Sequence, residues 1–280
     1  MQKGIDPVKA DGLFTGMSGM GTMTKPTLKG RMISASLFFF VLLILGPAPE
    51  TPAAGKEMIS AAHFASPELV KGIPTGWVLD RKAGKVNLRL ERADENFVVR
   101  LISDRKSSFG IKREFHVDLK EYPFLHWRWK AVCLPRGGDV RRAETDDQAV
   151  QFYVAFPATG FPAELNTPVI GYIWDNEAPK GWAGRSEQIG GGKLRYLVIR
   201  NKSDRLGEWY AEHRNLYEDF RNLFWDLKEV NTVTHGIQFH INSQHTKSEA
   251  EGCIGSVFFS RQDTKGMIAS AAFPAVRPLR

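Results

Sequence analysis

Short segments in which apolar and polar residues alternate recur along most of the chain. In residues 125–131, Leu125, Trp127, Trp129 and Ala131 fall on one face and polar residues fall on the other. Alternation with a period of two is typical of an antiparallel strand with one buried face. Similar apolar or alternating segments occupy residues 86–90, 97–102, 111–119, 149–156, 169–174, 194–200, 234–241 and 255–260. The pattern therefore predicts a mostly β protein.

One segment has a different period. Between residues 209 and 224 the apolar positions are Trp209, Leu216, Phe220, Leu223 and Phe224, a spacing that predicts an amphipathic helix over about 209–224. Many short strands separated by turn residues, with a single helix, favour an antiparallel β-sandwich or jelly roll.

The N-terminal residues 1–54 differ from the rest of the chain. An uncharged apolar run occupies residues 33–45; basic residues precede it and Gly-Pro-Ala-Pro follows it. This order is typical of a secretory signal, and the run is shorter than the roughly 20 residues of a membrane span. We therefore expect a protein exported to the periplasm or beyond, with an uncleaved leader that tethers it to the inner membrane through residues 33–45 as the alternative.

Composition indicates how residues 55–280 are organised into domains. We expect a linker over residues 55–62, a single β-sandwich domain over 63–262 and a loose tail over 263–280, since 280 residues suffice for one good core. The net charge of +7 is carried partly by the leader and is mild for this length. It does not indicate a nucleic-acid-binding protein.

The chain has two cysteines, Cys133 and Cys253. In an oxidising compartment they would be able to form a disulfide that joins an early strand to the last one. Two buried free thiols are the alternative, because sequence does not show whether the two positions lie within reach of each other.

Two groups of residues have the chemistry of a ligand site. Asp146 and Asp147 close a charged loop before the strand at 149–156, and carboxylates there would bind Ca²⁺ or sugar hydroxyls. A solvated turn, or pairing with Arg128, Arg141 or Arg142, explains the two acids equally well.

The second group follows the strand at 169–174. Trp174, Asp175, Glu177 and Trp182 combine aromatic faces with carboxylates, as sugar-binding sites do. The alternative is a core tryptophan followed by a solvated loop.

The predicted helix carries a further set of charged residues. Glu212 and Asp219 are seven residues apart and would share a helix face, where two carboxylates could serve as the acid and base of a glycoside hydrolase. An ordinary solvated face has the same composition. Arg214 would either bind a ligand or clamp neighbouring acceptors.

Several of these segments, taken in order, resemble a known bacterial family. They are Tyr122-Pro123-Phe124-Leu125-His126-Trp127-Arg128-Trp129, Asp146-Asp147 with Gln151-Phe152-Tyr153-Val154-Ala155-Phe156, Gly171-Tyr172-Ile173-Trp174, and Trp209 with Glu212, Arg214-Asn215, Asp219-Phe220 and Phe224. From about Phe64 to about Ser260 the chain resembles the domain-of-unknown-function family numbered 3047. The resemblance implies an exported single domain, a β-sandwich, and no known reaction.

The chain departs from the family pattern at one place. An acidic Asp-Thr-Asp-Asn-Thr stretch follows the penultimate strand in the family, whereas this chain has Asn242-Ser243-Gln244-His245-Thr246. Amides supply oxygens without charge, so a cation site in this corner would be lost or altered. His235, His240 and His245 recur at five-residue intervals, and in a strand His235 and His240 face opposite sides and cannot bind one ion together without a bulge. We therefore expect no metal site and no cofactor, with structural Ca²⁺ as the alternative.

Three functions remain open at this point. The first is an exported module that binds a glycan or a cell-envelope polymer. The second is a carboxylate-dependent hydrolase of an envelope saccharide. The third is a structural or interaction protein without a small ligand.

Overall fold

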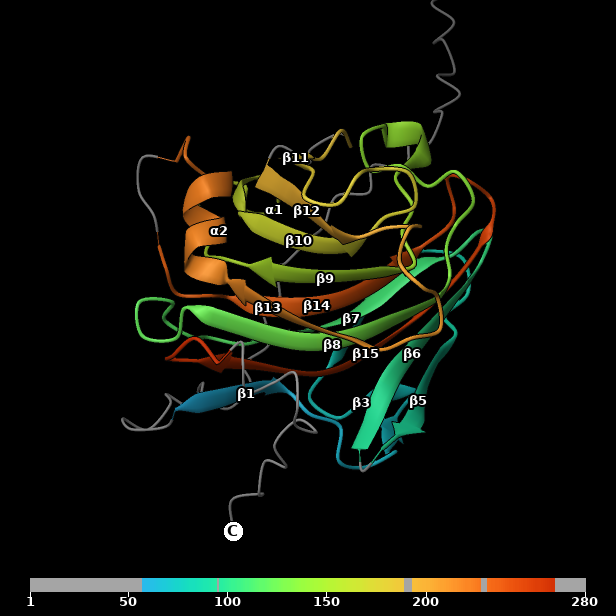
Figure 1. The fold of residues 1–280 in the computed structure, drawn as a ribbon, viewed down its shortest axis with the longest axis horizontal. Helices are drawn as coiled ribbons and strands as arrows, with labels where there is room; N and C mark the ends of the chain where they lie inside the picture. The colour runs from blue at the N-terminus through green and yellow to red at the C-terminus, as the bar shows by residue number, and fades with distance from the viewer. Residues whose placement is uncertain (1–56, 95, 189–192, 228–230, 265–280) are drawn as a thin grey trace, which may run out of the picture. The chain divides into compact units, whose positions relative to one another are not determined.

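The computed structural model describes residues 57–94, 96–188, 193–227 and 231–264 (Figure 1). These residues form the expected mostly β fold, in which two antiparallel or mixed sheets pack face to face. The prediction of a β-sandwich is confirmed. The leader, residues 1–54, and most of the expected tail lie outside the described residues. No described helix is long and apolar enough to cross a membrane.

The six-stranded sheet has the strand order β13-β8-β15-β6-β5, with β1 paired to β15. Its strands are β1 (Met58–Ala62), β5 (Leu88–Ala93), β6 (Asn96–Asp104), β8 (Phe124–Cys133), β13 (Tyr210–Asn215) and β15 (Glu249–Ser260). Residues 58–62 were expected to be linker. They form strand β1 instead, because their backbone pairs with the last strand and Ala61 and Ala62 are buried.

The seven-stranded sheet has the order β11-β12-β10-β9-β14-β7-β4. Its strands are β4 (Val78–Ala83), β7 (Ser108–Glu114), β9 (Val150–Ala155), β10 (Val169–Trp174), β11 (Ala183–Arg185), β12 (Leu194–Arg200) and β14 (Gly236–Asn242). Only β10 and β12 pair in parallel among these strands. The remaining elements are the β2 (Leu69–Val70) and β3 (Ile73–Pro74) hairpin, a 3₁₀ turn at Ala143–Thr145, α1 (Ala163–Asn166) and α2 (Leu216–Leu223).

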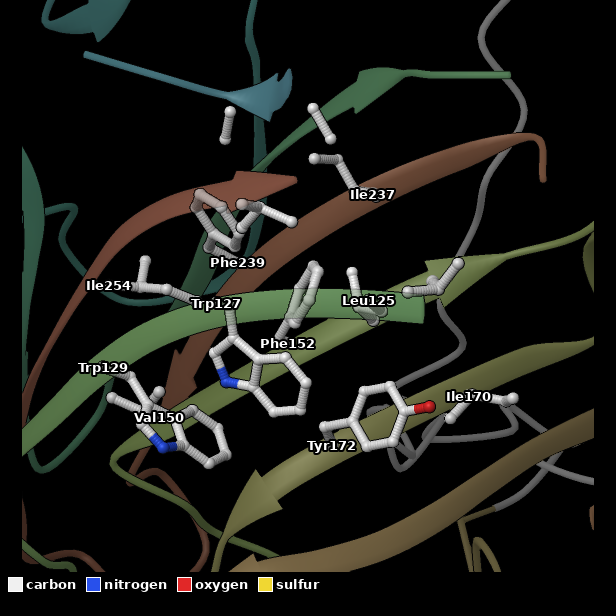
Figure 2. Close-up of a cluster of buried hydrophobic side chains, with 14 of the residues drawn as sticks. Leu125, Trp127, Trp129, Val150, Phe152, Ile170, Tyr172, Ile237, Phe239 and Ile254 are labelled. Atoms are coloured by element: carbon white, nitrogen blue, oxygen red, sulfur yellow. The ribbon is translucent and has the colours of Figure 1, made fainter. Parts of the chain in front are cut away.

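Aromatic side chains fill the space between the two sheets. Figure 2 shows Trp127 and Trp129 of β8 beside Phe152 and Tyr172 of the opposite sheet. The ring of Trp127 stacks on Tyr172 with centroids 5.0 Å apart and meets the edge of Phe152 at 5.5 Å. These are the inward positions that the alternation in residues 125–131 and 149–156 predicted, so burial of this face drives the pairing of the sheets.

The expected helix over 209–224 is wrong in its first half. Residues 210–215 are strand β13, which pairs with β8 so that His213 lies opposite His126, and the helix begins only at Leu216. The Asn215 side chain accepts a hydrogen bond from the Glu218 backbone N–H and caps the helix there. Pairing with an open sheet edge therefore overrides the helical spacing of the apolar residues.

The seven-stranded sheet is buried on both faces. Every residue of β9, β10 and β14 is buried, although one face of each strand points away from the six-stranded sheet. Val140 and Ala178, from the loops before β9 and after β10, pack on this outer face against Ile173 and Tyr153. Loops thus cover a sheet face that a plain two-layer sandwich leaves open to water.

Candidate functional site

A small pocket lies on the loop-covered outer face of the seven-stranded sheet. We call it the sheet-face pocket. It is lined by Lys82, Ser108, Asp146, Gln151, Tyr153, Gln188, Tyr196, His240, Asn242 and His245. It has room for roughly one water molecule. Apart from the aromatic rings its lining is polar, and it combines five strands with the loops at residues 146, 188 and 245.

Strand alternation brings the polar side chains to one face. Gln151 and Tyr153 are two residues apart on β9, and His240 and Asn242 are two residues apart on β14. Side chains two apart on a strand share a face, and His240 lies directly opposite Gln151 in the register of the two strands. The inward positions between them, such as Phe152, hold the core.

A chain of short hydrogen bonds joins the strands to the loop above them. The Tyr153 hydroxyl donates to Gln151 Oε1 at 2.6 Å, and Gln151 Nε2 donates to Asn242 Oδ1 at 2.6 Å. Asn242 Nδ2 then donates to the backbone oxygen of Asp146 at 2.6 Å, and its Oδ1 also accepts from the Gln148 N–H at 2.9 Å. Because these groups satisfy one another, they fix the floor of the pocket.

Asp146 is the carboxyl group of the pocket. Its Oδ1 accepts from Gln148 Nε2 at 3.0 Å, whereas among the described residues its Oδ2 has only long contacts of 3.4 Å, with the Tyr196 hydroxyl and Gln188 Nε2. Burial raises the pKa of Asp146 from 3.8 to about 7. Oδ2 can therefore accept a further hydrogen bond, and the Asp146 carboxyl group is readily protonated near neutral pH.

His240 is neutral and its tautomer follows from its neighbours. Burial lowers the pKa of His240 from 6.5 to about 4. Gln238 Nε2 donates to the ionised Asp80 at 2.9 Å and to His240 Nδ1 at 3.1 Å, so the imidazole proton sits on Nε2. Nε2 then donates to Ser108 Oγ at 3.0 Å, which leaves the Ser108 hydroxyl proton able to donate into the pocket. A serine in this arrangement is a hydrogen-bond donor, because the imidazole has no lone pair facing it to take its proton.

The charges beside the pocket compensate one another. Lys82 Nζ lies 3.1 Å from Asp80 Oδ1. Although burial alone would raise the pKa of Asp80, the neighbouring Lys82, His240 and Lys112 hold it below its usual value. The side chain that brings positive charge to the lining is thus already paired with a carboxylate.

Asp147 lies beside the pocket and carries one unsatisfied oxygen. Its side chain is completely buried, and Oδ2 accepts from the Thr246 N–H at 2.6 Å. Within the described part of the chain Oδ1 has no hydrogen-bond partner, and it lies 4.0 Å from Nδ1 of His245. The structure therefore separates the two predicted acids: Asp146 lines the pocket and Asp147 anchors the loop at residues 245–246.

The loop after β10 does not form the predicted sugar platform. Trp174 is completely buried between the sheets with its ring 5.9 Å from that of Trp129, so the prediction that it stacks on a ligand is wrong. Asp175 accepts the backbone N–H groups of Val140 at 2.9 Å and Ala178 at 2.7 Å and so holds the covering loops together.

Glu177 and Trp182 lie in the same loop, outside the pocket. Glu177 forms an ion pair with Lys202. Trp182 packs half-buried against the outer face of the sheet. These two residues are therefore brought near the covered face, and neither is among the pocket-lining side chains.

Glu212 and Asp219 are held in separate clamps. Glu212 is on β13 and accepts from Trp129 Nε1 at 2.8 Å and Arg200 Nε at 2.6 Å. The expectation that it shares a helix face with Asp219 is therefore wrong, because the helix begins after it.

Asp219 accepts from the Tyr172 hydroxyl at 2.8 Å and from Arg214 Nε at 2.9 Å. Arg214 is thus a clamp for a carboxylate rather than a group that faces a cavity. The oxygens of Glu212 and Asp219 accept hydrogen bonds from side chains that belong to the framework. A hydrolytic role for either residue stays a prediction without geometric support.

The predicted disulfide is absent, and both thiols are free. Cys133 lies opposite Glu251 and Cys253 lies opposite Lys130, so the two cysteines are diagonal neighbours across β8 and β15. Diagonal neighbours are roughly 7–8 Å apart, farther than the about 4.4–6.8 Å that a disulfide spans between Cα atoms.

No group of three His, Cys, Asp or Glu side chains in the described residues is placed to hold a metal ion. Calcium binding at Asp146 and Asp147 stays a prediction. Asp146 Oδ1 accepts a hydrogen bond from Gln148, and Asp147 Oδ2 accepts one from the backbone of Thr246.

Sequence reasoning missed most of the lining. Tyr196, His240, Asn242 and Ser108 were not singled out as ligand-binding residues. The sequence offered one indication, which is that polar residues such as Gln151 and Tyr153 occupy the outward face of a clearly predicted strand. Polar side chains on such a face must contact either water or other polar groups that cover it.

Comparison with solved structures finds carbohydrate-binding modules and a xyloglucanase domain among its matches. The xyloglucanase domain of NopAA from Sinorhizobium fredii, in complex with cellobiose, matches 68% of this chain and 95% of its own, with 9% identity and a TM-score of 0.41. A family 11 carbohydrate-binding module from Clostridium thermocellum, in complex with a β-1,3-1,4-mixed-linked tetrasaccharide, matches 72% of this chain and 95% of its own, with 8% identity and a TM-score of 0.39. No curated protein sequence matches the chain.

A family model described as "Protein of unknown function (DUF3047)" matches residues 76–258. This range contains the seven-stranded sheet and, apart from β1 and the last two residues of β15, the six-stranded sheet, and it contains every residue that lines the sheet-face pocket. The chain belongs to the DUF3047 family.

Proposed function

We propose that this protein is an exported binding module that takes a neutral saccharide at the sheet-face pocket. The observation that carries the proposal is the convergence of amide, hydroxyl, imidazole and carboxyl groups on one buried sheet face. Burying so many polar groups costs free energy unless each is bonded. The polar groups on this buried face can form directed hydrogen bonds with a ligand, and sugar hydroxyls are recognised by such bonds.

The charge of the pocket favours a neutral ligand. His240 is uncharged at neutral pH because burial lowers its pKa to about 4. Lys82 is paired with Asp80, and Asp146 contributes negative charge as it ionises. An anionic ligand would meet the Asp146 carboxylate, and the lysine of the described lining is already paired with Asp80, so phosphate-rich polymers suit the site poorly.

Two atoms of the pocket have capacity for a ligand. Within the part of the chain that the structure describes, the contacts of Asp146 Oδ2 are no shorter than 3.4 Å, and the Ser108 hydroxyl proton is not used by His240. One accepts a hydrogen bond and the other donates one, and a sugar hydroxyl does both. The floor residues Gln151 and Asn242 are bonded to each other, to Tyr153 and to the Asp146 backbone, and they serve to hold these two atoms in place.

Calorimetric titration of the purified protein with neutral oligosaccharides tests the proposal. Wild type should bind at least one of the gluco-, manno-, galacto- or N-acetylated series, and Ser108→Ala and Asp146→Asn should each weaken binding by about tenfold, the loss expected for one hydrogen bond.

Asp219→Asn is the matched control, because it removes a structural carboxylate that does not line the pocket. It should lower stability and leave affinity unchanged. Equal affinity in the Ser108 and Asp146 variants, or no binding to any series, would contradict the proposal.

Export is the second part of the proposal and rests on the basic and apolar leader, residues 1–54. N-terminal sequencing of the protein recovered from a bacterial periplasm should show a cut after the apolar run 33–45. A chain that stays in the cytoplasmic fraction would contradict export and leave the binding proposal standing.

A further inference from the structure

The chain inserts its own amide into the sheet-face pocket. Gln188, in the loop after β11, is one of the lining residues. Its Nε2 donates to the backbone oxygen of Ala143 at 2.8 Å and to Asp146 Oδ2 at 3.4 Å. Both partners are acceptors, so the nitrogen end of the carboxamide faces the pocket.

This contact shows which hydrogen-bonding groups a ligand of the pocket must supply. Two acceptors, the Ala143 carbonyl and Asp146 Oδ2, share the protons of one amide nitrogen. Asp146 is buried and Ala143 is half-buried, and acceptors shielded from water are costly to leave without a donor, so a ligand that displaces Gln188 must bring two donors of its own. The pocket holds roughly one water molecule while Gln188 is in place, so a sugar enters only when this side chain leaves.

We infer that the pocket takes a 2-acetamido sugar, whose amide N–H and adjacent hydroxyl replace the Gln188 carboxamide on Ala143 and Asp146. This inference rests on the function proposed above and names its ligand class. In an N-acetylhexosamine the amide N–H and a hydroxyl are attached to neighbouring ring carbons. The two donors are therefore close together, as are the Ala143 and Asp146 acceptors, which share one nitrogen of Gln188. A peptide backbone offers one N–H with no donor on the neighbouring carbon, so a sugar meets the requirement better than a peptide does.

Gln188 then acts as an internal competitor. Ligand binds only the fraction of molecules in which the Gln188 side chain has left its acceptors, which lowers the apparent affinity by that fraction. Removing the side chain beyond Cβ frees the acceptors. Gln188→Ala should therefore bind the ligand more tightly, by about tenfold if the two contacts together are worth one good hydrogen bond.

Calorimetric titration of the full protein tests the inference with three probes. The first is an N-acetylglucosamine oligosaccharide, and the second is a cello-oligosaccharide of the same length, in which hydroxyls replace the acetamido groups. The third is an N-acetylated dipeptide amide, which carries the amide without the sugar. Gln262→Ala is the matched control variant, because Gln262 is exposed and outside the pocket.

The expected result is binding of the N-acetylated oligosaccharide more than about tenfold tighter than the cello-oligosaccharide. Gln188→Ala should tighten it further, and Gln262→Ala should match wild type. Equal binding of the two oligosaccharides overturns the inference and leaves the proposed function standing. Binding of the dipeptide amide as tight as that of the sugar overturns the choice of a sugar.

Weaker binding by Gln188→Ala would make Gln188 a ligand contact and overturn its role as a competitor. An absence of binding to all probes by both wild type and Gln188→Ala, with folding verified by urea unfolding, overturns the inference. A separate titration with manno- and galacto-oligosaccharides then decides whether the proposed function falls with it.

Discussion

Replacing Asp146 with Asn should change how the stability of the protein depends on pH. The carboxyl group is buried, and its pKa is raised from 3.8 to about 7. Between these two values the folded protein holds a proton that the unfolded chain releases. The free energy of unfolding contributed by this group is therefore fully present below about pH 4 and is lost as pH rises through about 7. Asparagine has the same shape and no proton to lose.

The size of the effect follows from the pKa difference. A shift of about three units at about 1.4 kcal/mol each gives roughly 4 kcal/mol over the whole pH range. Integrated between pH 5 and pH 8.5, the part that the experiment samples is about 3 kcal/mol. Asp146→Asn should be close to wild type or slightly less stable at pH 5. At pH 8.5 the difference should have moved by about 3 kcal/mol in favour of the variant.

Urea unfolding of both proteins at the two pH values measures this difference, and other titrating groups cancel because both proteins share them. Glu144→Gln is the matched control, since Glu144 is an exposed acid two residues earlier in the same turn. It should show no pH-dependent difference from wild type. A wild-type-to-Asn difference that is the same at pH 5 and pH 8.5 would refute the burial argument for Asp146.

Three further predictions concern the framework. Adding a reductant should leave the melting temperature unchanged, since Cys133 and Cys253 are free thiols; a drop would show that a disulfide forms. Gly110→Ala should destabilise the protein by about 2 kcal/mol or more in urea unfolding, because a Cβ there would lie 2.1 Å from a backbone oxygen of β14; an unchanged midpoint would contradict this close approach. Asp219→Asn should cost about 2–4 kcal/mol by the same assay, because Arg214 would keep its charge without its carboxylate, and a loss below 0.5 kcal/mol would contradict the clamp.

The strands were predictable where large apolar side chains alternate with polar ones. Trp127 and Trp129 identify β8 in this way, because the sheet repeats every two residues and its inward face must be apolar. β13 was missed because its inward and outward positions are both partly polar, as Glu212 and His213 illustrate. Its strand conformation comes from pairing with β8, which local sequence does not contain.

The site was predictable only in part for the same reason. Asp146 drew attention as an acid next to a strong strand, and the structure places it in the pocket lining. Its partners Tyr196 and Asn242 lie 50 and 96 residues away in sequence, so their proximity depends on the order of strands in the sheet. Trp174 had the composition of a sugar platform but belongs to the core, because its position in β10 faces inward.

Histidine NMR during a titration with an N-acetylglucosamine oligosaccharide tests the central claim most directly. The chain carries its own control, because His240 and His245 line the sheet-face pocket, whereas His126 and His213 pair with each other in the six-stranded sheet. Binding in the pocket predicts that the ring signals of His240 and His245 shift with ligand concentration while those of His126 and His213 stay in place. Shifts confined to His126 and His213, or none at saturating ligand, would contradict the account.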